Sequence, residues 1–190
     1  MNTLVFLLEE PSAKEMLKGI LPRLLPEHIQ PQFIVFEGKQ DMHKKLVTRL
    51  RYWQTPDSYF IILRDQDSGD CKKIKQDLQA LCQEAGQPSC LVRIACHELE
   101  SFYLGDLAAV EAGLHLSGLA RQQNNRKYRQ PDQLANAAQE LSLITGKTYQ
   151  KLAGSRRIAP HLNLQAHANT SLSFQALISG IKKVVRAAPI

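Results

Sequence analysis

The sequence predicts an α/β fold: a Rossmann-like parallel sheet of about four strands with helices on both faces, followed by a mainly helical, basic C-terminal extension. Short apolar segments alternate with amphipathic segments through residues 1–118. The apolar segments are nearly uninterrupted, which is typical of parallel strands buried on both faces. Residues 121–190 contain 11 Lys and Arg against 2 Asp and Glu. We therefore expect residues 119–190 to form the basic extension, packed on the same domain.

The first two strands are predicted near the N-terminus. The segments "NTLVFLLEE" and "QFIVFEG" have the short apolar stretches and the branched or aromatic content of buried strands. Between them, "PSAKEMLKGILPRLL" has a helical apolar period, with Ser12 and Glu15 at the spacing of a capping box. Pro22 must kink or end this helix. After the second strand, Asp41 is a candidate N-cap for a helix with an apolar face.

The third and fourth strands are predicted in "YFIIL" and "CLVRIAC". The helix between them, "KKIKQDLQALCQEAG", is expected to begin after a cap at Asp70 and to close on Gly86. The segment "ELESFYLGDLAAVEAGL" follows the fourth strand and looks helical. Beyond it we expect a polar loop in "RQQNNRKYRQPDQ" and further helices at about 132–145 and 172–187.

Acidic residues follow three of the four predicted strands. Ligands of parallel α/β sheets bind at the carboxyl ends of the strands, so we expect these acids at one edge of the sheet. If the backbone stays extended, Asp65 and Asp67 point to the same side. The spacing does not choose which of Glu98 and Glu100 faces the site. The acids concerned are Glu9, Glu10, Asp65, Asp67, Glu98 and Glu100.

Carboxylate oxygens are the ligands that Mg²⁺ prefers, usually one or two of them with waters and a substrate phosphate. The sequence therefore predicts a site for Mg²⁺ or Mn²⁺ at this edge. Glu10 is ambiguous beside Glu9, since it could neutralise a basic neighbour. The predicted metal ligands are Glu9, Asp65, Asp67, and Glu100 or Glu98.

The basic residues predict contacts with the phosphates of a nucleic acid. Lys39 follows the second strand, at the carboxyl edge where a phosphate could be met. Tyr128 lies among the cations of the extension and is a candidate to stack on a base. A basic surface that docks an acidic partner protein is the alternative interpretation. The cations assigned to nucleic acid in the extension are Arg126, Lys127, Arg129, Arg156 and Arg157.

The sequence shows neither a secretion signal nor a membrane span. The apolar run near its start, "LVFLL", has no basic residue before it and two glutamates after it. A signal peptide needs a basic start and a longer apolar stretch, and a membrane helix needs about 20 apolar residues. The four cysteines lack CxxC spacing, so a disulfide framework is not expected. We therefore expect a cytoplasmic protein.

Five segments follow one another along the chain: "EEPSAKEMLKGILPRLLP", "EGKQDM", "LRDQDSGDC", "RIACHELESFYLGDL" and "YQKLAGSRRIAP". Together they resemble a bacterial family known only as a domain of unknown function, number four-two-seven-six. The resemblance runs from about residue 4 to residue 182. That family is in turn similar to the TOPRIM domain, the fold shared by topoisomerases, primases and OLD-type nucleases, which implies a TOPRIM-type sheet.

The TOPRIM resemblance implies roles for particular residues. Its pattern is a glutamate after the first strand and a D-x-D after the third, which Glu9, Asp65 and Asp67 match. OLD-type nucleases add a later glutamate and a C-terminal lysine, which correspond here to Glu100 (or Glu98) and Lys151. The segment "LLEEPS" lacks the glycine that many TOPRIM domains have after the glutamate. The resemblance also implies an AAA-type ATPase partner and a role in phage defence.

Taken together, these features predict a metal-dependent nuclease that hydrolyses the phosphodiesters of DNA or RNA. Two metal ions would clamp the attacking water and the leaving oxygen. One alternative is a phosphoacceptor domain of receiver or phosphatase type, although that class expects a hydroxyl residue after the fourth strand, where Ala95, Cys96 and His97 lie. The other alternative is a non-catalytic TOPRIM-like binding subunit with a degenerate metal site.

Overall fold

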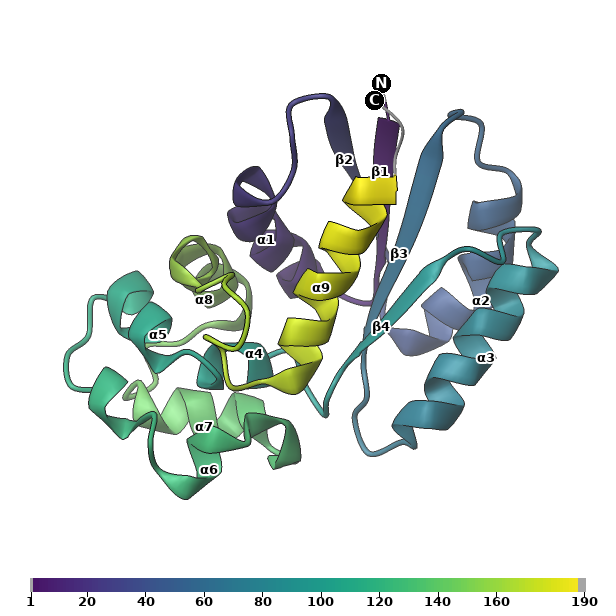
Figure 1. Cartoon of the computed structure of the whole chain (residues 1–190). Coiled ribbons are helices and arrows are strands. Elements are labelled where there is room, and N and C mark those ends of the chain that lie inside the picture. Colours follow the sequence, from purple (N-terminus) through teal and green to yellow (C-terminus); the bar gives the residue numbers. More distant parts are fainter. Residues whose placement is uncertain (1, 188–190) are drawn as a thin grey trace.

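A computed structural model describes residues 2–187 as a four-stranded parallel sheet with helices on both faces (Figure 1). The strand order is β2-β1-β3-β4, and every neighbouring pair of strands is parallel. The predicted α/β fold class is therefore confirmed. The strands are β1 (Asn2–Leu8), β2 (Ile29–Val35), β3 (Ser58–Asp65) and β4 (Leu91–Ala95).

The core is divided between the two faces of the sheet. Successive residues of a strand point to opposite faces, and β1 is buried along its whole length. Val5 packs in one cluster with Leu46 and Leu78 of the helices α2 and α3, whereas Phe6 packs in the other cluster with Leu17 of α1. The helix α9 covers the same face as α1 (Figure 1). These helices are α1 (Pro11–Ile20), α2 (Lys39–Arg51), α3 (Cys71–Glu84) and α9 (Leu172–Ala187).

Three of the predicted helix ends are confirmed. The side chain of Asp70 accepts two backbone N–H bonds in the first turn of α3, at 2.7 and 3.0 Å. Gly86 has a φ of 79°, in the left-handed region that glycine adopts at little cost after a helix. The helix α1 ends at Ile20 and continues as a 3₁₀ turn, Leu21–Arg23, that contains Pro22.

Two predicted caps are wrong. Asp41 lies in the first turn of α2 rather than at its N-cap, and accepts a backbone N–H from the preceding loop. Ser12 does not cap α1, because its hydroxyl donates to the carboxylate of Glu10, which is itself the N-cap residue. Glu15, the other half of the predicted capping box, instead accepts a hydrogen bond from Arg156 of a distant helix. Of these three side chains, only Glu15 makes a long-range contact in place of the predicted cap.

The helix predicted at about 172–187 is confirmed as α9, whereas the chain between β4 and α9 forms shorter helices than predicted. The helix expected over "ELESFYLGDLAAVEAGL" is interrupted at Gly105, and the one expected from about residue 132 begins at Ala137. The structure also forms α6 within the predicted loop, and α8, which the sequence did not predict. The helices are α4 (Ser101–Leu104), α5 (Leu107–Leu114), α6 (Arg126–Arg129), α7 (Ala137–Ile144) and α8 (Lys151–Ile158), with 3₁₀ turns at Ala120–Gln122, Pro131–Gln133 and Ala159–His161.

The later helices share a core with the sheet. One cluster of buried apolar side chains joins Phe6 of β1 and Leu17 of α1 to Leu141, Ile158 and Phe174 of α7, α8 and α9. The division of the chain at residue 118 stays a prediction.

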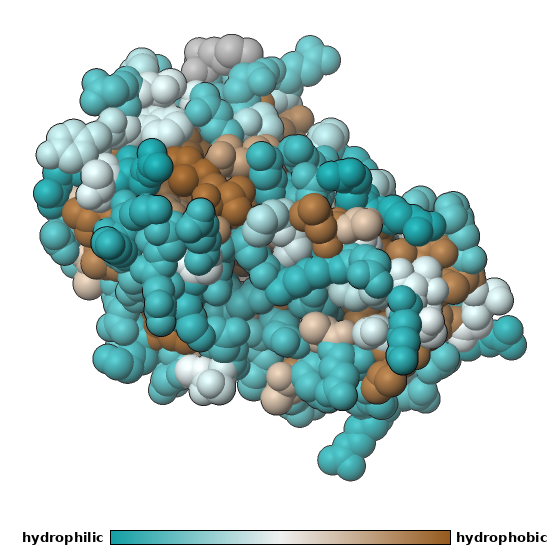
Figure 2. All heavy atoms as spheres, turned by 180° about the vertical axis from the view of Figure 1, so that it is seen from behind, coloured by the Kyte–Doolittle hydropathy of each residue, from teal (hydrophilic) through white to brown (hydrophobic). Residues whose placement is uncertain are grey.

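Hydrophilic residues cover most of the face opposite to that of Figure 1. Figure 2 shows this face, on which hydrophobic residues form separate patches. Within residues 2–187, none of the helices combines the length and the apolar character needed to cross a membrane. The four cysteines are free thiols.

A glycine in α5 allows α8 to pack closely. A Cβ atom on Gly113 would lie 2.6 Å from the carbonyl oxygen of Arg157 and 2.7 Å from the Cα of Ile158. These are backbone atoms, so they cannot move aside as the end of a flexible side chain would. A side chain at this position must displace α8, whose first residue is Lys151.

We expect Gly113→Ala to lower the free energy of unfolding by about 1–3 kcal/mol, the usual cost of overpacking. Alanine has the higher helix propensity, so a loss of stability isolates the steric effect. Urea unfolding measures it. The control is Ala112→Ser, which also adds one heavy atom to α5 but at an exposed position, and should change stability by less than about 0.5 kcal/mol. Equal stability of Gly113→Ala and the wild type would contradict the close packing of α5 and α8.

Candidate functional site

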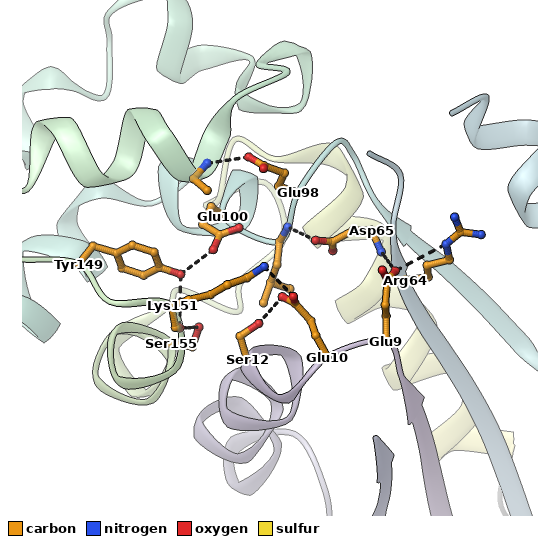
Figure 3. A network of polar contacts seen from close by, with 12 residues as sticks. Glu9, Glu10, Ser12, Arg64, Asp65, Glu98, Glu100, Tyr149, Lys151 and Ser155 are labelled. Carbon is orange, nitrogen blue, oxygen red and sulfur yellow. Dashed lines mark hydrogen bonds and ion pairs between the residues drawn. The ribbon is translucent and has the colours of Figure 1, made fainter. Parts of the chain in front are cut away.

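Acidic side chains gather where β1, β3 and β4 end, at the carboxyl edge of the sheet. Asp65 is the last residue of β3, Glu9 and Glu10 directly follow β1, and Glu100 precedes α4. Figure 3 shows the carboxyl groups of Glu10, Asp65 and Glu100 converging around the side chain of Lys151. The predicted location of the site at this edge thus agrees with the parallel arrangement of the strands.

Asp65 is buried in a way that disfavours its charged form. It is 8% exposed, and its Oδ2 accepts a hydrogen bond from the backbone N–H of Leu99 at 3.2 Å. Burial raises the pKa of Asp65 well above its ordinary value, and the charges of Glu10, Glu100 and Glu9 raise it further. The hydrogen bond from Leu99 opposes this rise. A carboxyl group in such surroundings is stabilised by a proton or by a nearby cation.

Glu100 is fully buried and only half satisfied. Its Oε1 accepts a hydrogen bond from the hydroxyl of Tyr149 at 2.8 Å, whereas its Oε2 is buried without a hydrogen-bond partner in the described part of the chain. Burial raises the pKa of Glu100, although Lys151 and Tyr149 act to lower it. An unsatisfied buried oxygen costs about 1–3 kcal/mol, more if it is charged. The second oxygen therefore lacks a hydrogen-bond partner among residues 2–187, which makes the charged form of Glu100 costly.

Lys151 is the cation among these acids. It is the first residue of α8, and its Nζ lies 2.6 Å from Oε2 of Glu10. Burial on its own would lower the pKa of Lys151, but the hydrogen bond to Glu10 and the charges of Glu100 and Asp65 raise it overall. The expectation that Glu10 could neutralise a basic neighbour is confirmed by this contact.

Glu9 belongs to the other side of the sheet edge. Its Oε2 accepts a hydrogen bond from the backbone N–H of Asp65 at 3.2 Å and lies 3.6 Å from Nε of Arg64. Burial raises the pKa of Glu9, Arg64 lowers it, and Asp67 raises it. Arg64 and Asp65 are consecutive in β3, so they point to opposite faces, and Figure 3 shows Arg64 turned away from Lys151. Glu9 thus contacts the backbone of Asp65 and not its carboxyl group.

Two acids of the site form no ion pair within residues 2–187. Glu9 pairs with Arg64, and Glu10 pairs with Lys151. Within residues 2–187, Asp65 and Glu100 form no ion pair, and they are the two most deeply buried acids of the site. Any further positive charge at the site would be attracted chiefly to these two residues.

Asp67 does not join the cluster. Its φ is 55°, so the backbone leaves the extended conformation there. The condition under which Asp65 and Asp67 were expected to point to the same side, a backbone that stays extended, is therefore not met. The carboxylate of Asp67 instead lies 2.7 Å from Nζ of Lys39, and its side chain is 39% exposed. Lys39 is accordingly paired with an acid.

Of the two glutamates after β4, Glu100 faces the site. Oε2 of Glu98 accepts the backbone N–H of Ala138 at 2.7 Å, in the first turn of α7. A carboxylate at that place satisfies a free N–H group and interacts favourably with the helix dipole. Glu98 is therefore engaged at the start of α7, and its role as a metal ligand stays a prediction.

The basic residues assigned to nucleic acid differ in their surroundings. Lys127 lies 2.7 Å from Glu140, and Arg156 lies 2.6 Å from Glu15. Tyr128 is 2% exposed and donates its hydroxyl to Glu140 at 2.6 Å, so the expectation that it stacks on a base is wrong. The other assigned cations are the exposed Arg126, Arg129 and Arg157.

Sequence reasoning missed Tyr149 and Arg64. The alternation of side chains along β3 could have placed Arg64 opposite Asp65. Tyr149 lies in a segment without a periodic signal, and only the resemblance around Lys151 points to that region. The absence of a side chain at Gly154 leaves space for the ring of Tyr149, because a Cβ atom there would lie 2.4 Å from Cδ2 of the ring.

The ligand chemistry of the site fits a hard divalent cation. Among residues 2–187, no group of three or more His, Cys, Asp and Glu side chains is arranged to hold a metal ion. The predicted set of Glu9, Asp65 and Asp67 is therefore not assembled. Mg²⁺ often takes only one or two carboxylates, with waters and a substrate phosphate as its other ligands. Asp65, together with the unpartnered Oε2 of Glu100, offers that number.

Comparison with known proteins identifies a family. The family described as a domain of unknown function, DUF4276, matches residues 8–182. The match covers most of the chain, including every acid of the site and Lys151. No curated protein and no solved structure matches the chain.

We expect Asp65→Asn to raise the free energy of unfolding near pH 7 by about 1–2 kcal/mol, as removal of a buried charge can. The raised pKa of Asp65 means that the folded protein binds more protons than the unfolded chain above the ordinary pKa of an aspartate. Wild-type stability therefore falls as the pH rises from the ordinary pKa of an aspartate to the raised pKa of Asp65. The advantage of the variant should shrink toward about pH 4. Urea unfolding in EDTA, at a series of pH values, measures it.

The control for this prediction is Asp67→Asn, which removes an exposed acid two positions away. It should change stability little, and in the opposite direction, because it breaks the ion pair with Lys39. If Asp65→Asn differs from the wild type by the same amount at every pH, the buried charge of Asp65 is not the cause.

Proposed function

We propose that this chain, which belongs to the DUF4276 family, is a metal-dependent nuclease of TOPRIM or OLD type that hydrolyses the phosphodiesters of a nucleic acid. The observation that carries the proposal is the pair of buried carboxyl groups, Asp65 and Glu100, left without an ion pair among the described residues. Strongly perturbed carboxyl groups in one place are typical of functional sites. Their location at the carboxyl edge of a parallel sheet supports the same conclusion.

Asp65 and Glu100 would hold Mg²⁺ or Mn²⁺, and the charge of Glu10 would add to the negative field there. The bound ion would polarise the phosphoryl group and lower the pKa of a bound water. This set differs from the one that the TOPRIM resemblance implies. Asp67 and Glu98 are engaged elsewhere, and Glu9 supports the backbone of Asp65.

Lys151 would stabilise the negative charge of the phosphoryl oxygens. An ammonium group has three N–H donors, and in the described part of the chain Lys151 forms an ion pair with Glu10 alone. Its side chain is 51% exposed, so a substrate can reach it. A fixed positive charge beside the reacting phosphate favours the transition state, where the charge is redistributed. Tyr149 would act as a positioning residue, because it fixes Oε1 of Glu100 and leaves Oε2 for a ligand.

The two alternatives are supported differently. A phosphoacceptor role for Asp65 is disfavoured by its burial and by its hydrogen bond to Leu99. A non-catalytic binding subunit is favoured by one observation, the contact of Lys151 with Glu10, because a protein cation already lies among the acids. Measurement of cleavage distinguishes this role from the nuclease. A cytoplasmic location is proposed from composition, and an AAA-type ATPase partner and a role in phage defence from resemblance.

We expect Asp65→Asn and Glu100→Gln each to lower the rate of Mg²⁺- or Mn²⁺-dependent cleavage of DNA or RNA by at least about 100-fold. Each change keeps the size of the side chain and removes one negative charge. Asp70→Asn is the matched control, because asparagine also caps helices well and Asp70 lies outside the cluster. Cleavage of labelled single-stranded and duplex substrates by purified proteins measures the rates. Wild-type rates in both variants would show that these acids are not metal ligands.

We expect Lys151→Gln to lower the cleavage rate by about 10–1000-fold while leaving substrate affinity nearly unchanged, as loss of a contact made chiefly in the transition state does. Lys147→Gln, at an exposed lysine four positions earlier, should leave the rate unchanged. Single-turnover cleavage at saturating enzyme separates the rate from the affinity. If Lys151→Gln loses affinity alone, Lys151 acts as a substrate clamp rather than at the reacting phosphate.

A further inference from the structure

A groove along α9 has both apolar and basic side chains in its walls. A hollow of about 810 Å³ lies between α9 and residues 163–169, which Figure 1 shows beside that helix. A second hollow of about 490 Å³ adjoins it, since both are lined by Asn163, Leu164, Gln165 and Lys182. We call the two hollows together the α9 groove. No acidic side chain lines the groove within residues 2–187, whereas six basic ones do: Arg23, His161, His167, Lys182, Lys183 and Arg186.

The cations of α9 repel one another. Lys182, Lys183 and Arg186 lie within little more than one turn, in a helix that contains neither Asp nor Glu. Like charges three or four positions apart destabilise a helix by about 0.2–0.5 kcal/mol per pair. The helix dipole favours cations near the C-terminus of α9, but it does not account for Arg23 on the adjoining wall. An anion in the groove would stabilise cations from all of these elements.

Hydrogen bonds in the groove hold cations in place without neutralising them. Nζ of Lys182 donates to the carbonyl oxygen of Leu164 at 3.1 Å. The guanidinium of Arg23 donates to the carbonyl oxygens of Leu162 and Ala159, at 2.8 and 2.9 Å. Lys127 and Arg156 of the basic surface predicted from the sequence are instead paired with carboxylates. The uncompensated positive charge therefore lies in the α9 groove more than on α6.

We infer that the α9 groove binds the phosphate backbone of the nucleic acid. For its ligand, the inference rests on the proposed function. Phosphates are recognised by Lys and Arg side chains without regard to sequence, and they set the register of the strand on the protein. Lys183 and Arg186 are exposed and free to contact them, and Lys182 adds its charge from the wall of the groove. The groove thus supplies sequence-independent affinity, separate from the residues of the acid cluster.

The test compares two triple variants that remove equal charge. One is Lys182→Ala/Lys183→Ala/Arg186→Ala in the groove, and the other is Arg126→Ala/Lys127→Ala/Arg129→Ala on α6. Fluorescence anisotropy with labelled single-stranded and duplex DNA and RNA, from low to high salt in EDTA, gives affinity and salt dependence. We expect the groove variant to bind at least about tenfold more weakly at low salt. The slope of log K against log salt should flatten by about 2–3, since each phosphate contact contributes about 0.7–0.9.

The α6 variant should change the affinity by less than about threefold. Equal weakening by both variants would identify a general charge effect and overturn the inference. Weaker binding of nucleic acid by the α6 variant alone would also overturn the inference. Unchanged binding in both variants would also overturn the inference, and would favour an acidic protein as the partner that binds the groove. The double variant Lys183→Gln/Arg186→Gln, at two exposed positions, repeats the test if the triple variant is poorly folded, with an expected flattening of about 1–2.

Failure of this inference is distinguishable from failure of the proposed function. EDTA removes the metal, so the binding measurement does not depend on cleavage. Asp65→Asn should bind with the wild-type salt slope although it is expected not to cut. A protein that binds through the groove but never cleaves would support the groove and contradict the nuclease. If the wild type cleaves but the groove variant keeps the wild-type salt slope, the result would support the nuclease and contradict the binding of phosphates in the groove.

Discussion

The burial of Asp65 and Glu100 side by side at one edge of the sheet is the constraint on which the arrangement of the later helices depends. Each carboxyl group raises the energy of the other's charged form. The helix α8 brings Lys151 to this place, and the residue two positions earlier, Tyr149, holds Oε1 of Glu100. Glycines 113 and 154 leave room for α8 and for the ring of Tyr149. The pair Arg156–Glu15 then ties α8 to α1.

The two faces of the sheet edge are balanced in a similar way. On one face Glu10 pairs with Lys151, and on the other Glu9 pairs with Arg64. Asp65 lies between these two pairs. Its backbone N–H donates a hydrogen bond to Glu9, and the charge of Glu10 raises the pKa of its carboxyl group. The site therefore holds two compensated acids and two uncompensated ones. A divalent cation bound to the uncompensated pair would remove the main electrostatic cost of the cluster.

The alternation of apolar strands and amphipathic helices was enough to predict the sheet, because short apolar segments such as "YFIIL" form buried strands whatever their partners. The carboxyl-edge location of Asp65 and Glu100 followed from the same pattern. The pairing of the acids did not, because it depends on backbone angles and distant contacts. Asp67 turns away through a left-handed φ, and Glu98 meets an N–H group of α7. The helix α8 was missed because packing against α1 and α5, rather than a strong apolar period, stabilises it.

The most direct test of the central claim is a calorimetric titration of the wild-type protein with Mn²⁺, in two buffers of different ionisation enthalpy. If Asp65 and Glu100 hold the ion, binding should be saturable and should release protons below neutral pH, because a carboxyl group with a raised pKa must ionise to bind a metal. Glu100→Gln should weaken the binding and reduce the proton release. Binding of equal strength in wild type and Glu100→Gln, or no saturable binding at all, would contradict the assignment of this pair as the metal site.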